Sequence, residues 1–190
     1  MVRIAVCGTH CSGKTTLIED FLNVHRDYVN EPEPYEWLAE YGEELAEQPD
    51  VESFYRQLEI SIDRLAQYGK GTRLIAERSP VDFLAYMLAL DDLGRAGRDC
   101  SLIATAAELA AAGLDHVDVL VVLPLNDMDR IVAPESEDLE LRDAMNDRLV
   151  EIFTTDPYSL FARGTPRILE IHGPPRQRLL ALERALFEME

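Results

Sequence analysis

Short, almost continuously apolar runs alternate along the chain with longer stretches in which apolar residues recur every three or four positions. The short runs predict five buried strands, at residues 2–7, 28–31, 73–76, 117–123 and 167–171. The longer stretches predict helices at residues 14–24, 35–46, 51–68, 80–90, 102–112, 140–153 and 177–189. This regular alternation predicts an α/β fold with a five-stranded parallel sheet and helices on both of its faces.

The first predicted strand runs directly into a segment that matches the phosphate-loop (Walker A) pattern G-x-x-x-x-G-K-[ST] without departure. Its glycines allow turns that a Cβ forbids, so the loop N–H groups and the following helix N-terminus can face phosphate oxygens. We therefore expect the three-layer sandwich of P-loop NTPases with a small lid. The expected ATP-binding residues are Gly8, Thr9, His10, Cys11, Ser12, Gly13, Lys14, Thr15 and Thr16.

Within this loop, Lys14 supplies a charge for the β and γ phosphates, and Thr15 supplies a hydroxyl for Mg²⁺. We therefore expect ATP and Mg²⁺ to bind, with Lys14 also among the catalytic residues. His10 and Cys11 occupy variable positions of the pattern and are interpreted as loop filling.

Two other predicted strands end in carboxylates. Glu77 can hold Mg²⁺ through water or accept a proton from an attacking hydroxyl, and Arg78 can neutralise a transferring phosphoryl group. The alternative is a strand-terminal ion pair that caps the next helix. Either Glu31 or Glu33 could activate a substrate hydroxyl, against the alternative of a solvated acidic turn. Trp37 either stacks on a substrate ring or packs between helices.

Length and charge narrow the possible functions. The 190 residues suit a single domain spanning 1–190, and a net charge of −18 disfavours binding to DNA or RNA. An odd number of cysteines argues for reduced thiols and an intracellular address. No apolar run is long enough to cross a bilayer. We expect a cytoplasmic protein without a membrane partner, and a homodimer remains open.

The residues resemble the deoxynucleoside kinase group of P-loop kinases. The resemblance rests on the phosphate loop, Glu33-Pro34, Trp37, Ser53-Phe54, Gln57 and Glu77-Arg78-Ser79, which occur in that family's order. It implies that Glu33 is the base for a sugar hydroxyl, that Gln57 pairs with a nucleobase, and that Arg78 places the reacting groups. An exposed helical glutamine is the alternative for Gln57.

The chain also resembles a wider set of small P-loop ATPases and kinases, including nicotinamide riboside kinase-like domains. Both resemblances imply a lid, placed at about residues 126–148, with arginines that close over the phosphates. Here that stretch holds more acids than bases, and its candidates are Arg130 and Arg142, with Arg148 at its end. The segment 172–176 after the last strand lies where such folds often touch adenine.

These observations favour ATP-dependent phosphoryl transfer to a hydroxyl of a small molecule, in the first instance a nucleoside or a similar compound. A P-loop ATPase or GTPase that acts as a nucleotide-dependent switch is the main alternative. A kinase of modified nucleic acid is a further one, which the acidic charge disfavours. The sequence leaves open which of Glu31, Glu33 and Glu77 is the base.

Overall fold

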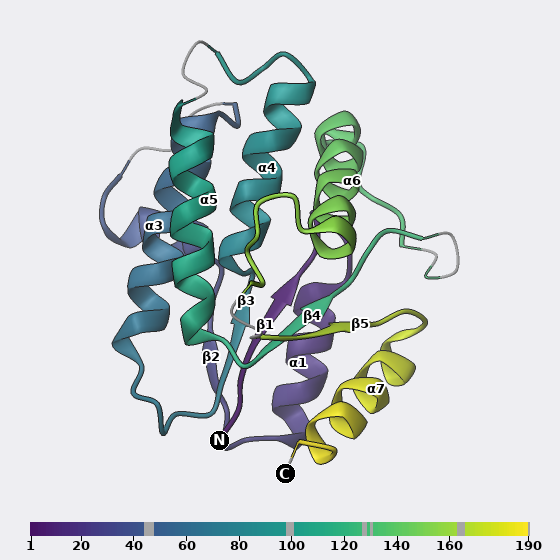
Figure 1. Ribbon diagram of the computed structural model, residues 1–190. Helices are drawn as coiled ribbons and strands as arrows, with labels where there is room; N and C mark the ends of the chain where they lie inside the picture. The colour runs from purple at the N-terminus through teal and green to yellow at the C-terminus, as the bar shows by residue number, and fades with distance from the viewer. Residues whose placement is uncertain (44–47, 98–100, 127–128, 130, 163–165, 190) are drawn as a thin grey trace.

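The computed structural model describes residues 1–43, 48–97, 101–126, 129, 131–162 and 166–189. Five strands in this part form one parallel sheet with the order β2-β3-β1-β4-β5 (Figure 1). They are β1 Arg3–Cys7, β2 Val29–Glu31, β3 Leu74–Glu77, β4 Val119–Val122 and β5 Arg167–Glu170. All neighbouring pairs are parallel, so the predicted fold class is confirmed.

The helices of the described part match the predicted ones closely. They are α1 Lys14–Val24, α2 Pro34–Glu40, α3 Val51–Gln67, α4 Pro80–Asp92, α5 Ser101–Gly113, α6 Leu139–Thr155 and α7 Pro175–Phe187, with a short 3₁₀ turn η1 at Leu114–His116. The prediction of a helix over 35–46 was wrong in its length. Helix α2 ends at Glu40, and Gly42 follows with a φ of 70°, a conformation that favours glycine and stops helices.

Alternate residues of the central strand β1 enter two separate apolar cores. Ala5 and Cys7 face the larger core, which α3, α4, α5 and α6 cover, whereas Ile4 and Val6 face the smaller core beneath α1 and α7. Figure 1 shows these two helical layers on opposite faces of the sheet. The period of two along the strand is therefore what produces the three-layer sandwich.

The sheet register brings the predicted functional segments to one edge. Val6 at the end of β1 pairs with Glu77 of β3, and Glu31 at the end of β2 pairs with Ala76. Because carboxyl ends of parallel strands meet at one edge, the phosphate loop and both acidic strand ends face the same cleft.

The predicted lid over 126–148 falls into two parts. Residues 139–148 belong to α6, where Leu141 and Met145 are buried in the larger core, so this half is a packed helix. Residues 131–138 have no helix or strand, whereas 127, 128 and 130 lie outside the described residues. A closing movement remains a prediction for 126–138 alone.

Candidate active site

The phosphate loop joins β1 to α1 and has the backbone that its glycines predict. Gly13 has a φ of 89° at the N-cap of α1, where a Cβ would lie only 2.6 Å from the guanidinium of Arg178. Lys14 is buried, and its Nζ donates to the carbonyl of Thr9 at 2.9 Å. Burial and the nearby Arg78 lower the pKa of Lys14 to about 8. An anionic ligand at this loop would therefore stabilise the charged lysine.

Asp82 of α4 fixes the start of the phosphate loop. Its fully buried carboxylate accepts from the Gly8 N–H at 2.8 Å and from the Ser79 N–H and hydroxyl at 2.9 and 2.8 Å. With the Ser79 side chain bonded to Val81, this is a capping box at the N-terminus of α4. One side chain thus joins the first turn of α4 to the loop that would hold phosphate.

Thr15 and Glu77 meet at the exposed side of the loop. The Thr15 hydroxyl donates to a Glu77 carboxylate oxygen at 3.0 Å. Burial raises the pKa of Glu77, although Lys14 opposes the shift. A hydroxyl and a carboxylate at the mouth of a phosphate loop are hard oxygen donors, and Mg²⁺ is bound by one or two such groups together with water and substrate phosphates. The residues present therefore fit Mg²⁺.

Arg78, directly after β3, and Glu33, directly before α2, are in contact and form an ion pair. Arg78 is buried and has a φ of 72°, a strained backbone for a residue with a side chain. Glu33 is the N-cap residue of α2, but its side chain makes no capping bond and is partly exposed. Burial would raise the pKa of Glu33, but Arg78 and Lys14 outweigh it and lower the pKa. Glu33 is therefore held as a carboxylate beside the loop.

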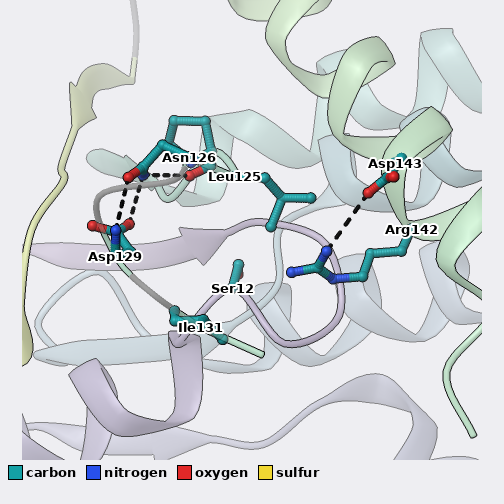
Figure 2. A pocket seen from close by; sticks show the side chains of 8 residues that line it. Ser12, Leu125, Asn126, Asp129, Ile131, Arg142 and Asp143 are labelled. Carbon is teal, nitrogen blue, oxygen red and sulfur yellow. Dashed lines mark hydrogen bonds and ion pairs between the residues drawn. The ribbon is translucent and has the colours of Figure 1, made fainter. Parts of the chain in front are cut away.

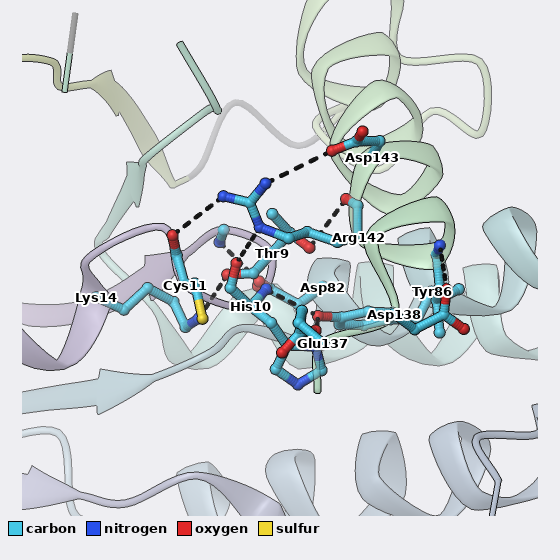
Figure 3. A network of polar contacts seen from close by, with 12 residues as sticks. Thr9, His10, Cys11, Lys14, Asp82, Tyr86, Glu137, Asp138, Arg142 and Asp143 are labelled. Carbon is cyan, nitrogen blue, oxygen red and sulfur yellow. Dashed lines mark hydrogen bonds and ion pairs between the residues drawn. The ribbon is translucent and has the colours of Figure 1, made fainter. Parts of the chain in front are cut away.

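Tyr86 connects this ion pair to the phosphate loop. Its hydroxyl accepts from the backbone N–H of His10 at 3.2 Å and from Arg78 at 3.4 Å, and it lies 2.9 Å from Nδ1 of His10. Its ring is stacked on Phe54 of α3 with a centroid distance of 4.5 Å. Figure 3 shows His10, Tyr86, Asp82 and Lys14 gathered around the loop.

Glu31 and Trp37 contact each other and residues of α3. The buried carboxylate of Glu31 accepts from the Trp37 indole N–H at 2.7 Å, from Arg64 at 2.9 Å and from the Tyr68 hydroxyl at 2.5 Å. Arg64 also stacks over the Trp37 ring at 3.8 Å. Both residues thus have strong partners within the protein, and their predicted contact with substrate remains a prediction.

Gln57 is placed differently from Glu31. It lies on α3 one turn after Phe54 and is 7% exposed, and in the described part of the chain its amide has no hydrogen-bond partner. The amide atoms themselves are not fully enclosed, so a ligand with donor and acceptor edges could reach and fit this position. The alternative of an exposed helical glutamine does not apply.

Arg142 lies on the outer side of the phosphate loop. Its guanidinium donates to the carbonyls of His10 at 3.0 Å and Cys11 at 3.3 Å, while its own carbonyl accepts from the Thr9 hydroxyl at 3.0 Å. Figure 2 shows it across a cavity of about 260 Å³ from Asn126 and Asp129. Arg130, the other predicted lid arginine, lies outside the described residues. Arg148 pairs with Asp92 and Glu151, away from the loop.

Arg178 of α7 ties the last helix to the phosphate loop. Its buried guanidinium donates to the carbonyls of Ser12 at 2.7 Å and Gly173 at 2.8 Å and forms an ion pair with Asp129. Asp129 in turn accepts from the Gly173 N–H at 2.7 Å. The loop after β5 is thereby fixed beside Gly13, with a cavity of about 180 Å³ between them.

Comparison with known proteins identifies the family. A model of the family described as AAA domain matches residues 3–164, which is most of the chain. The chain belongs to this AAA domain family. The family match covers the phosphate loop, the Glu33–Arg78 pair and α6, and it ends before β5 and α7. No curated protein matches the sequence.

Solved structures share the fold across nearly the whole chain. Deoxyadenosine kinase from M. mycoides with bound dATP has a TM-score of 0.64 at 17% identity, covering 98% of this chain and 100% of that one. The same enzyme with dCMP and dCDP as products gives 0.68 at 15%, covering 99% and 100%. Thymidylate kinase from Candida albicans gives 0.67 at 17%, covering 99% and 92%.

These similarities confirm the fold of the P-loop deoxynucleoside kinase-like group that the sequence predicted, within the AAA domain family. At such low identity they show the fold alone, so the residues of this chain must carry any argument about its substrate. Among the described helices none is both long and apolar enough to cross a membrane.

Sequence reasoning missed three residues that organise the site: Asp82, Tyr86 and Arg178. All three are buried. Helix α4 is buried on every side from Pro80 to Leu90, so its polar residues carry no periodic signal. The sequence Ser79-Pro80-Val81-Asp82 does contain the spacing of a capping box, which could have indicated Asp82.

Proposed function

We propose that this protein transfers the γ-phosphoryl group of ATP to a hydroxyl of a small molecule, in the first instance a nucleoside. The observation that carries the proposal is the Arg78–Glu33 ion pair beside the phosphate loop. A hydrolysing switch needs to position water, whereas a kinase needs a carboxylate base facing an acceptor. Glu33 has the ionised state and the exposure that a base requires.

In this proposal each part of the site has a separate task. The loop N–H groups and Lys14 hold the donor phosphates, and Arg78 offsets the negative charge of the transferring group. Glu33 takes the proton of the acceptor hydroxyl. Glu77 would hold the metal with Thr15 and is not the proposed base, because its carboxylate accepts a hydrogen bond from the Thr15 hydroxyl. Mg²⁺, when bound, neutralises phosphate charge.

The charges around the cleft favour a neutral nucleoside over a nucleoside monophosphate. A phosphate dianion is best bound by arginines that are not already paired with a carboxylate. In the described part, Arg56 pairs with Glu43 and Glu59, and Arg64 pairs with Glu31. Arg95 likewise pairs with Asp138 and Glu140. The unpartnered amide of Gln57 suits the edge of a nucleobase.

Residues 131–138 are proposed to close over the donor and exclude water, as a kinase requires to avoid hydrolysing ATP. Arg142 stays on the loop carbonyls through this movement, because α6 is fixed in the core. In this proposal Arg142 therefore stabilises the conformation of the phosphate loop and does not move with the lid.

The proposal is tested by ADP release from ATP and Mg²⁺, alone and with each member of a panel of nucleosides, nucleoside monophosphates and nicotinamide riboside. We expect one or more nucleosides to stimulate ADP release strongly, and monophosphates to have little effect. Steady ADP release that no compound stimulates would instead favour the nucleotide-dependent switch.

A further inference from the structure

The side chain of His10 stands on the phosphate loop with one edge held by the protein. Its Nδ1 lies 2.9 Å from the Tyr86 hydroxyl and 3.3 Å from a carboxylate oxygen of Glu137. For Nε2, on the opposite edge, no partner is found among the described residues, and the side chain is 41% exposed. Figure 3 shows the imidazole between the loop and Glu137. One ring nitrogen is therefore constrained while the other is available to a ligand.

The hydrogen bonds of the Tyr86 hydroxyl bear on which imidazole nitrogen of His10 carries the proton. The Tyr86 oxygen already accepts from the His10 backbone N–H and from Arg78. Its own proton then needs an acceptor. The Thr9 side chain also hydrogen-bonds to Tyr86, and its hydroxyl donates to the Arg142 carbonyl, whereas Nδ1 of His10 lies 2.9 Å from the Tyr86 oxygen. We assign Nδ1 as the acceptor of this proton, and the proton of a neutral imidazole then resides on Nε2.

The surroundings keep the ring neutral. Burial lowers the pKa of His10 to about 4, and the cations of Arg78, Lys14 and Arg142 act in the same direction against Glu33. The facing groups are thus Arg78 and Tyr86 from the α4 side, Glu33 from α2, Arg142 from α6, Lys14 from α1 and Glu137 from the loop before α6. Glu137 would accept from Nδ1 only after the ring gains a second proton.

We propose that His10 donates its Nε2–H to an oxygen of the phosphoryl acceptor, and that Tyr86 is the positioning residue that fixes this tautomer. The position suits the task, because Tyr86 and Glu33 both contact the guanidinium of Arg78. The His10 imidazole and the proposed base Glu33 are thus linked through Tyr86 and the guanidinium of Arg78. The acceptor group in question is a hydroxyl oxygen of the sugar, and this inference rests on the proposed function.

The tautomer can be measured without any activity. Nitrogen-labelled protein is studied by NMR correlation of the imidazole ring atoms, with the His10 signals assigned by their loss in His10→Asn. We expect a neutral ring with a proton on Nε2 and none on Nδ1 between about pH 6 and pH 8, the range in which an unperturbed histidine titrates. In Tyr86→Phe, which retains the ring stacked on Phe54, the titration midpoint should rise because Glu137 can then pair with a protonated ring. A proton on Nδ1 in the unaltered protein would overturn the proposal.

Steady-state kinetics test the contact with the acceptor. His10→Asn and Tyr86→Phe should each raise the acceptor KM about 10-fold, the effect of losing one hydrogen bond, with a smaller change in ATP affinity. His10→Gln, whose amide N–H reaches the position of Nε2, should retain more acceptor affinity than His10→Asn. Tyr158→Phe, a change at a partly exposed tyrosine after α6, is the matched control.

The outcomes separate this inference from the proposed function. If the unaltered protein phosphorylates a nucleoside while both variants keep its acceptor KM, the role of His10 is wrong and the kinase assignment stands. If no acceptor is phosphorylated and the ring still shows the Nε2–H tautomer, the proposed function fails and the acceptor contact fails with it.

Discussion

Arg78 and Glu33 are 45 positions apart in the chain and form an ion pair beside the phosphate loop. The pair depends on two backbone features: the positive φ of Arg78 directly after β3, and the N-cap position of Glu33 at the start of α2. Pro34, the first residue of α2, starts that helix in the right place. The site is thus assembled by the ends of two neighbouring strands.

Removing the carboxylate of Glu33 tests its role as base. Glu33→Gln should lower kcat by about 10²–10⁴-fold, the range typical of general base catalysis, with ATP affinity little changed. Glu36→Gln, at an exposed position of the same helix, is the control and should keep full activity. A Glu33→Gln protein with normal kcat would move the role of base elsewhere.

The depressed pKa of Glu33 predicts the acid limb of the pH profile. A base works only when ionised, so activity is present above its pKa and is lost as pH falls through it. Because Arg78 and Lys14 hold the pKa below the usual 4.5, the acid limb that Glu33 sets in kcat/KM of the free enzyme should have its midpoint below that pH. Arg78→Lys, which changes the geometry of the ion pair with Glu33, should shift the acid limb to higher pH. An acid limb near neutrality would contradict this account.

The lowered pKa of Lys14 predicts proton uptake when ATP binds at alkaline pH. In the free protein Lys14 loses its proton as pH rises through about 8, and bound phosphates should restore it. ATP affinity should therefore fall above this pH, and calorimetry in buffers of different ionisation enthalpy should detect the proton. Lys14→Arg stays charged and should bind ATP without this uptake.

Lys14→Met should abolish ATP binding without harming the fold. Burying a charged lysine opposes folding, so the variant should unfold at the same temperature or higher. Turnover retained by Lys14→Met would show that the phosphate loop is not the donor site. Loss of both the fold and activity would leave the lysine a structural residue.

Asp82→Ala should be strongly destabilising, since it leaves the buried Gly8 and Ser79 N–H groups without an acceptor. We expect a loss of ~3 kcal/mol in the free energy of unfolding, measured with urea. ATP affinity should fall too, because the start of the loop is released. Asp63→Asn, at an exposed position of α3, should lie within about 0.5 kcal/mol of the unaltered protein.

Gln57→Ala should harm the nucleoside acceptor far more than it harms ATP. The amide is buried without a partner among the described residues, so its removal costs no internal hydrogen bond. The KM of the nucleoside should rise about 10-fold or more, while thermal stability stays close to that of the unaltered protein. Equal effects on ATP and the nucleoside would remove the base-pairing role.

The sequence predicted the sheet and α1 well because their signals are local. Strand β1 is wholly buried and is apolar after Arg3, and the glycines of the loop define the start of α1 at Lys14. The end of α2 was harder to predict, because Tyr41 continues the helical pattern and only the conformation of Gly42 stops the helix. Helix boundaries of this kind depend on a single backbone angle.

The organisation of the site was harder to predict, because it depends on contacts between distant positions. Arg178 reaches Ser12 across 166 positions of the chain, and in sequence it reads as one more charge on a surface helix. Tyr86 lies in a helix that is apolar on all sides, where a tyrosine reads as core. Glu31 depends on such contacts as well, since its carboxylate accepts from Trp37, Arg64 and Tyr68, and its contact with substrate remains a prediction.

The most direct test of the central claim follows the γ-phosphoryl group itself. ATP labelled in its γ-phosphate is incubated with Mg²⁺, a stimulating nucleoside and the unaltered protein, with Lys14→Met as the blank. The account predicts that the label appears in the phosphorylated nucleoside, identified by mass spectrometry, and that Glu33→Gln greatly slows its appearance. Label that appears only as inorganic phosphate, whatever nucleoside is present, would contradict the claim that this protein is a kinase.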